Sequence, residues 1–384
     1  MLVSEKSIVS LALLALFFKL LISPWSTGDF QTPTFQLFNY VCDGMILASI
    51  ILYIPFQYKI FSFIYIVTIL LLFTLLFSTF VLTENTIFNV ITMHLKIYQP
   101  LLFFTMLATY FSKNQLFAVK LSKNIAIYTA FLLVIGVLTL PVSINRTEVW
   151  WPSYFGGLHT TAYMAMSVFF IAFSLFLLNL IKGKVLLAVG LTVLYCVFFG
   201  WGVRTITGAF IILVGAYYLQ KTRFNEVEIL KITLPALLFI GAVLFVFIID
   251  SSDFDRFTSG RISMYAEKVD QLERNSIFSW IVGNGVGSDL ITTDIWWWAA
   301  KGAHSDLITI LVEGGVLYLG MTLLIFIKLF NLLKHSHARF LLLAFLFTSA
   351  FSNGYLVRPL PSYLFFVALA LSYSYQYRGG NNER

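Results

Sequence analysis

Long apolar runs separated by short polar segments cover almost the whole chain. The runs are continuous and most approach the ~20 residues that span a bilayer as a helix, whereas the strands of a membrane barrel would alternate polar and apolar residues. The pattern predicts an all-α polytopic membrane protein with about twelve transmembrane helices. Their expected ranges are 7–23, 35–56, 60–82, 90–111, 124–141, 157–181, 185–202, 205–220, 231–249, 304–328, 338–354 and 359–376.

One long polar segment, residues 250–303, interrupts this pattern before the tenth predicted helix. It combines charged residues with the sequence GNGVG at positions 283–287 and a run of tryptophans at 296–298. No internal repeat and no soluble-domain composition is apparent along the chain. The sequence therefore predicts a single membrane domain over 1–384, with one large loop over 250–303.

The composition narrows the class of protein further. Only 11% of the residues are charged and 59% are hydrophobic, whereas soluble domains have about 25% charged residues. The formal net charge of +7 does not indicate nucleic-acid binding, because most basic residues lie in short loops, as membrane topology requires. The two cysteines, Cys42 and Cys196, lie in apolar runs and indicate neither a disulfide framework nor a metal site.

Lysine and arginine are distributed unequally between the two sets of loops. With the N-terminus inside, fifteen of the 25 basic residues fall in inner loops and eight in outer loops, which places both termini in the cytoplasm. Six of the eight outer residues are arginines, the side chain that binds phosphate in a bidentate manner; a chance excess is the alternative. We expect a phosphate-bearing ligand on the outer face, contacted by members of the set Arg146, Arg204, Arg256, Arg261, Arg274 and Arg358.

Three residues are candidates for the chemistry itself. Arg204 lies between two apolar runs, where a cation either snorkels to the interface or meets an anion. Arg261 begins a segment typical of an interfacial helix, although a solvated loop arginine is an equal alternative. His304 stands where the large loop becomes a helix. Histidine titrates near neutrality and can take a proton from a hydroxyl, although a lone interfacial histidine is more often structural.

Two acids follow His304, and both are candidate substrate-binding residues. Asp306, together with Ser305, can cap the start of the helix. Glu313 is followed by two glycines inside an apolar run, so it must pair, protonate or face a polar cavity. We expect Glu313 to pair with a basic residue from another span.

The tryptophans and glycines of the large loop allow more than one interpretation. Trp296 and Trp297 can stack on sugar rings, which present apolar faces, or they can belong to the aromatic belt at the membrane interface. The sequence GNGVG follows no Rossmann-type strand, so a nucleotide site is disfavoured. No histidine or cysteine spacing indicates a metal site, and no cofactor is expected.

The order of these motifs resembles the bacterial O-antigen ligase and O-antigen polymerase superfamily. The resemblance rests on Gly202-Val203-Arg204, Ser259-Gly260-Arg261, the glycine loop and His304 at the start of a helix that contains Glu-Gly, together with the twelve-span layout. It implies transfer of a glycan from an undecaprenyl-diphosphate carrier at the periplasmic face of the inner membrane. It further implies that Arg204 and Arg261 hold the diphosphate and that His304 activates the acceptor hydroxyl. One departure is that the family histidine is often followed by asparagine, whereas Ser305 follows here.

Three functions are open at this point. The first is a polymerase of lipid-linked repeat units, acting with no metal and with inversion at the anomeric carbon, for which a chain-length regulator is a candidate partner. The second is a ligase that moves the finished polymer to the lipid A-core acceptor. The third, from another class, is a polysaccharide or lipid transporter, for which ionisable residues near the membrane midplane and inverted repeats would be typical. The tryptophan-rich loop favours the polymerase, which must recognise its own repeat unit.

Overall fold

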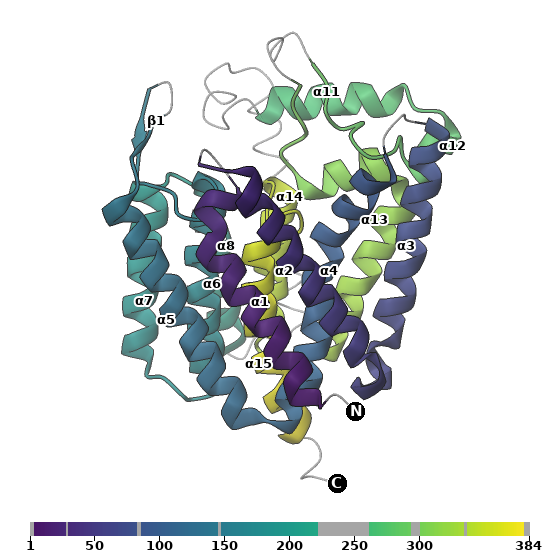
Figure 1. The fold of residues 1–384 in the computed structure, drawn as a ribbon. Helices are drawn as coiled ribbons and strands as arrows, with labels where there is room; N and C mark the ends of the chain where they lie inside the picture. The colour runs from purple at the N-terminus through teal and green to yellow at the C-terminus, as the bar shows by residue number, and fades with distance from the viewer. Residues whose placement is uncertain are drawn as a thin grey trace.

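The protein is an all-α, multi-pass membrane protein. The computed structural model describes residues 4–27, 30–82, 86–144, 147–221, 261–292, 300–333 and 336–379. Figure 1 shows a bundle of helices with α11 lying across one end of it, and this end is called the α11 end below. The start of α1 and the end of α15 lie at the opposite end.

The described elements are mostly long helices joined by short connections. In chain order the helices are α1 (Glu5–Ser26), α2 (Pro33–Tyr53), α3 (Ser62–Leu82), α4 (Ile87–Lys113), α5 (Gln115–Thr139), α6 (Leu158–Leu177), α7 (Gly183–Tyr195), α8 (Arg204–Lys221), α11 (Arg261–Glu273), α12 (Ile277–Val282), α13 (Asp306–Leu332), α14 (Arg339–Phe351) and α15 (Pro359–Gly379). Two short 3₁₀ turns (Ile54–Phe56 and Lys59–Phe61) separate α2 from α3. One small antiparallel hairpin joins β1 (Ser143–Ile144) to β2 (Val149–Trp150), with Ser143 opposite Trp150.

The helices agree with the hydropathy pattern. Every predicted span except 231–249, which lies outside the described residues, coincides with a described helix. By length and composition, 8 of the described helices can cross a membrane. The closely spaced pair α7 and α8 is separated by a π-helical turn (Cys196–Gly200) and by Gly202, whose φ of +63° few other residues adopt.

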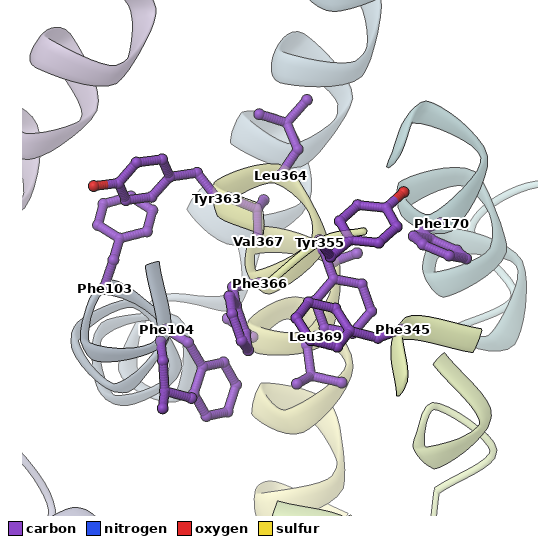
Figure 2. Close-up of a cluster of buried hydrophobic side chains, with 14 of the residues drawn as sticks. Phe103, Phe104, Phe170, Phe345, Tyr355, Tyr363, Leu364, Phe366, Val367 and Leu369 are labelled. Carbon is purple, nitrogen blue, oxygen red and sulfur yellow. The ribbon is translucent and has the colours of Figure 1, made fainter. Parts of the chain in front are cut away.

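The centre of the bundle is α15. Every residue from Leu360 to Ser374 is buried, and the helix packs against α4, α5 and α6. Figure 2 shows its aromatic rings between those of neighbouring segments, with Phe103 and Phe104 on one side and Phe170 and Phe345 on the other. A helix enclosed on all sides presents no polar face to solvent, which matches the even spread of apolar residues along α15.

Polar contacts fix the helices at the end opposite α11. Lys113 at the end of α4 donates to both carboxylate oxygens of Glu5 at 2.9 and 3.0 Å, and the Tyr53 hydroxyl donates to the same carboxylate at 3.0 Å. Within the bundle, the buried Lys19 of α1 pairs with Asp43 of α2. A charge inside a membrane protein is tolerated where it is paired in this way.

The large loop folds into defined structure over its described part. The helix expected to begin at Arg261 is confirmed as α11, which lies across the ends of the long helices (Figure 1). The short helix α12 then packs against α13. This arrangement holds the start of α11 above α8 and α14, where the candidate site is found.

Candidate functional site

Arg261 connects three helices at the α11 end. Its Nη1 donates to the backbone carbonyl of Phe351 at 2.6 Å and to the hydroxyl of Thr205 at 3.3 Å. The start of α11 is thereby joined to the end of α14 and to the first turn of α8. Arg204 is the first residue of α8, directly before Thr205, and its side chain is exposed.

Arg358 approaches the same region from the loop before α15. Its Nε donates to the carbonyl of Asn353 at 2.6 Å, and its Nη1 donates to the hydroxyl of Thr160 at 2.7 Å. Its guanidinium carbon lies 5.8 Å from the centre of the Tyr163 ring, within the range of a cation–π contact. Arg358 therefore connects the α14–α15 loop to the first turns of α6.

His304 lies among these cations. Its backbone adopts a left-handed conformation with φ of +51°, which is uncommon outside glycine and concentrates at functional positions. Burial, together with the positive charges of Arg261 and Lys301, lowers the pKa of the half-buried His304 imidazole below its usual 6.5. At neutral pH the imidazole is therefore uncharged and can accept a proton.

His159 completes the group. It lies in the first turn of α6 with an exposed side chain, and it interacts electrostatically with Arg358, Arg261 and His304. We call His159, Arg261, His304 and Arg358 the basic cluster.

Within the described part of the chain, no carboxylate lies within salt-bridge distance of the basic cluster, although Asp306 interacts electrostatically with Arg358 and Asp289 with His304. The ion pairs found there join Lys19 to Asp43, Lys113 to Glu5 and Lys268 to Asp289. Within the same residues, Arg261 and Arg358 donate to neutral oxygens only. Each guanidinium has five N–H donors, so donors remain for an anion.

The carboxylate of Asp306 shapes the loop that carries Arg358. Asp306 is fully buried and accepts hydrogen bonds from the backbone N–H groups of Gly354, at 3.0 Å, and Leu356, at 3.1 Å. The preceding Ser305 caps α13 as expected, accepting from the N–H of Ile308. Asp306, expected as a substrate-binding residue, thus holds the α14–α15 loop in place.

Glu313 differs from the sequence-based expectation. Instead of pairing with a basic residue from another span, its Oε1 accepts the backbone N–H of Gly287 at 2.9 Å. The glycine loop 283–287 also donates from Asn284 and Gly285 to the carbonyls of Val312 and Glu313. The expectation of an ion pair was wrong because backbone donors, supplied by a segment distant in the sequence, already reach the carboxylate.

The glycine loop and α13 meet backbone to backbone. At Gly315 the helix is broken, with φ of +70° and ψ of −176°. A Cβ added to Gly283 would lie 2.2 Å from the carbonyl oxygen of Glu313. These glycines therefore permit a close contact between two parts of the chain and need no bound phosphate to account for them.

A buried ion pair anchors α11 over this region. Lys268 of α11 and Asp289 are 3.0 Å apart and almost completely buried. The other Asp289 oxygen accepts from the N–H of Ala303 at 2.9 Å and from the hydroxyl of Thr309 at 2.7 Å. The approach to His304 and the first turn of α13 are thus tied to α11, the helix that begins with Arg261.

The structure brings some predicted residues together and separates others. Arg261, His304 and Arg358 converge, and Arg204 starts the helix whose second residue contacts Arg261. The exposed Arg274 follows the far end of α11, about 20 Å from Arg261 at 1.5 Å per helical residue. The candidates that lie outside the described residues are Arg146, Arg256, Trp296 and Trp297.

The structure adds two residues that the sequence did not single out. His159 follows Gly156 and Gly157 at the start of an apolar run, a setting similar to that of His304, and this shared pattern could have identified it. Tyr265 lies one helical turn after Arg261. Its hydroxyl is buried without a hydrogen-bond partner among the described residues, and burial raises its pKa. A buried polar group in this state is uncommon and needs an explanation.

These features define what the site can do. Guanidinium groups with unused donors can hold a phosphate-type anion in bidentate geometry, and a neutral imidazole beside them can accept a proton. Within the described ranges, no group of three or more His, Cys, Asp or Glu side chains could hold a metal ion. No family model matches the chain, and no curated protein is similar enough to it to count as a match.

Proposed function

We propose that the chain is a glycosyltransferase that polymerises undecaprenyl-diphosphate-linked oligosaccharide units of O-antigen or a related surface polysaccharide. The proposed location is the bacterial inner membrane, with the α11 end facing the periplasm. The observation that carries the proposal is the basic cluster, in which Arg261 and Arg358 interact electrostatically with His304 and, among the described residues, form no ion pair of salt-bridge length with a carboxylate. Arg204, Arg261 and His304 are also the residues whose sequence motifs resemble this superfamily.

The proposed reaction is a direct displacement at the anomeric carbon of the donor sugar. The acceptor hydroxyl oxygen forms the new glycosidic bond while the bond from the anomeric carbon to the diphosphate oxygen breaks. Undecaprenyl diphosphate leaves with the bonding electrons, and the hydroxyl proton passes to His304. The guanidinium groups of Arg204 and Arg261, the latter held by Thr205 and Phe351, stabilise the charge that develops on the leaving oxygen, which is selective for the transition state.

The same donor chemistry serves a ligase that transfers finished polymer to the lipid A-core, so the acceptor distinguishes the two activities. We expect the polymerase, and a separate chain-length regulator is compatible with it. The test is a strain lacking this protein, with its lipopolysaccharide resolved on a gel. A core carrying a single repeat unit indicates a polymerase, whereas bare core with polymer retained on the lipid carrier indicates a ligase. An unchanged glycan in the deletion strain refutes both.

Complementing that strain with His304→Ala tests the proposed proton acceptor. We expect the polysaccharide ladder to be lost, because general acid–base catalysis typically contributes about 10²–10⁴-fold to a rate. Membrane levels of the variant must match those of wild type, measured by immunoblot. A full ladder from normally expressed His304→Ala would remove the histidine from the mechanism.

The environment of His304 predicts how transfer depends on pH. The folded-state pKa lies below 6.5, so the imidazole stays neutral and active as the pH falls through 6.5 and is protonated only at lower pH. We therefore expect the acid-side midpoint of the transfer rate to lie below pH 6.5. Lys301→Gln removes one of the cations that lower this pKa and should move the midpoint upward.

Lys184→Gln provides the matched control for this profile. It makes the same charge change at the start of α7, toward the end of the bundle opposite α11, where the side chain is exposed. Its pH profile should overlay that of wild type. Coincident midpoints for Lys301→Gln and wild type would contradict the assignment of the acid limb to His304.

A further inference from the structure

The short helix α12 lies against the side of the bundle, at the level of the last turns of α3. The ring of Phe278 on α12 meets the ring of Phe77 on α3 edge-on, with 6.1 Å between the two centroids. Phe77 is five residues before the end of α3 at Leu82, about 8 Å at 1.5 Å per helical residue. Figure 1 shows α12 beside this end of α3, and the two helices are in contact. The chain therefore reaches below the end of a membrane-spanning helix at α12.

The glycine loop after α12 reaches a similar depth on α13. The N–H of Gly287 donates to Glu313, which lies seven residues after the start of α13, or about 10 Å along the helix. The chain then returns to α11, because Asp289 pairs with Lys268 of that helix at 3.0 Å. Residues 277–289 thus descend along α3 and α13 and come back to the level of α11.

The backbone of the glycine loop is paired entirely within the protein. All five N–H groups from Gly283 to Gly287 donate to protein oxygens at 2.9–3.2 Å, on Ser279, Val312, Glu313 and Thr79. A loop in water does not need such pairing, because water can replace each partner. Hydrocarbon offers no substitute, so irregular backbone is found at membrane depth only where the protein satisfies it or it lines a water-filled cavity. The hydrogen bonding of this loop meets the first of these requirements.

The side chains of α12 divide into a protein-facing side and an apolar outer side. Ser279 and Val282 are buried. The outer side consists of Ile277, Phe278, Trp280 and Ile281, which are 82%, 42%, 37% and 51% exposed. It adjoins the exposed apolar face of α3, which includes Phe77 and Phe80 and belongs to a helix that is long and apolar enough to cross a membrane. The lipid-facing surface of α3 therefore continues onto α12.

We propose that α12 and the glycine loop form a re-entrant segment, with the outer side of α12 embedded in the lipid leaflet at the α11 end. Interfacial helices bury their apolar face about 5–10 Å into the boundary between headgroups and acyl chains, and the contacts with Phe77 and Glu313 lie at this depth. Tryptophan, here Trp280, is enriched at that level. In contrast, α11 exposes Asp270 and Glu273 and stays in water. This inference does not depend on glycan transfer.

Spin labelling of the full chain in vesicles of phosphatidylcholine and phosphatidylglycerol tests the proposal. The background carries Cys42→Ala and Cys196→Ala, and a nitroxide is attached to Ile281→Cys on α12 or, as the matched control, to Asp270→Cys on α11. Collisions of the label with oxygen, which dissolves in acyl chains, and with a water-soluble nickel chelate are measured by power saturation. For a label at the depth of an interfacial helix, we expect the oxygen-to-nickel ratio to be about 5-fold higher at position 281 than at position 270.

Equal ratios at the two positions would place α12 in water and overturn the proposal. Low collision rates with both reagents at position 281 would overturn it as well, because a second copy of the chain or another protein would then cover α12. A measurement without a label guards against disturbance by the nitroxide. The fluorescence that is lost in Trp280→Phe belongs to Trp280, and lipids brominated on their acyl chains should quench it. Absence of quenching would contradict contact with lipid.

Discussion

Arg261→Ala is expected to lower the rate of glycan transfer by about 10²–10³-fold, the loss typical of removing one preorganised donor to a developing oxyanion. Arg261→Lys keeps the charge and loses the planar fork, so it should restore only part of the rate. The measurement is the initial rate with purified lipid-linked donor, normalised to the amount of monodisperse protein recovered from a sizing column. Arg261 also holds α11 to α8 and α14, so this normalisation is essential.

Arg274 provides the matched control on the same helix. It is exposed and follows the opposite end of α11, so Arg274→Ala should retain nearly the full rate. Equal losses for Arg261→Ala and Arg274→Ala would mean that the arginines act through general positive charge on the surface. In that case the specific geometry around His304 would not explain transfer.

Gly315→Ala should cause a large loss of stability for a single added methyl group. The backbone at Gly315 adopts a φ and ψ that are almost restricted to glycine. The new Cβ would also lie 2.4 Å from the backbone nitrogen of Gly283 and the carbonyl oxygen of Ile281. Backbone strain and overpacking together should cost about 2–6 kcal/mol, measured as a lower melting temperature in detergent and a lower yield of monodisperse protein.

Gly320→Ala tests the same substitution five residues further along α13. A Cβ there meets nothing within 4 Å, and alanine favours a helix over glycine by about 1 kcal/mol. This variant should therefore melt at the wild-type temperature or slightly above it. If Gly315→Ala and Gly320→Ala had the same melting temperature, the contact between the glycine loop and the broken helix would not exist in the folded protein.

The sequence was sufficient to predict features that depend on local composition. Apolar runs located the described long helices, because burial in a bilayer demands uninterrupted apolar length. Most ends agree within a few residues, but α5 begins at Gln115, nine residues before the predicted start at 124. The start of α11 at Arg261 and the Ser305 cap of α13 also followed from local signals. The convergence of Arg261, His304 and Arg358, expected only loosely from the bias of arginine toward one side, is found in the structure.

Features that depend on contacts between distant segments could not be predicted. The carboxylate of Glu313 meets the N–H of Gly287, 26 residues away, and Asp306 meets Gly354, 48 residues away. A sequence shows that an acid within an apolar run needs a partner, but it does not show which backbone donors the fold brings there. Arg274 illustrates the same limit. It is an arginine of the same loop as Arg261, but the length of α11 places it at the far end of that helix, away from the basic cluster.

The position of α15 determines when the bundle can close during synthesis. It is the last described helix in the chain, yet its residues form the centre around which α4, α5 and α6 pack. Until it leaves the ribosome, the hydroxyls of Ser167 and Ser174 on α6 lack the α15 carbonyls to which they donate in the finished protein. Helices α4, α5 and α6 therefore enter the membrane before the helix around which they pack, and α6 gains these two hydrogen bonds only after α15 has been inserted.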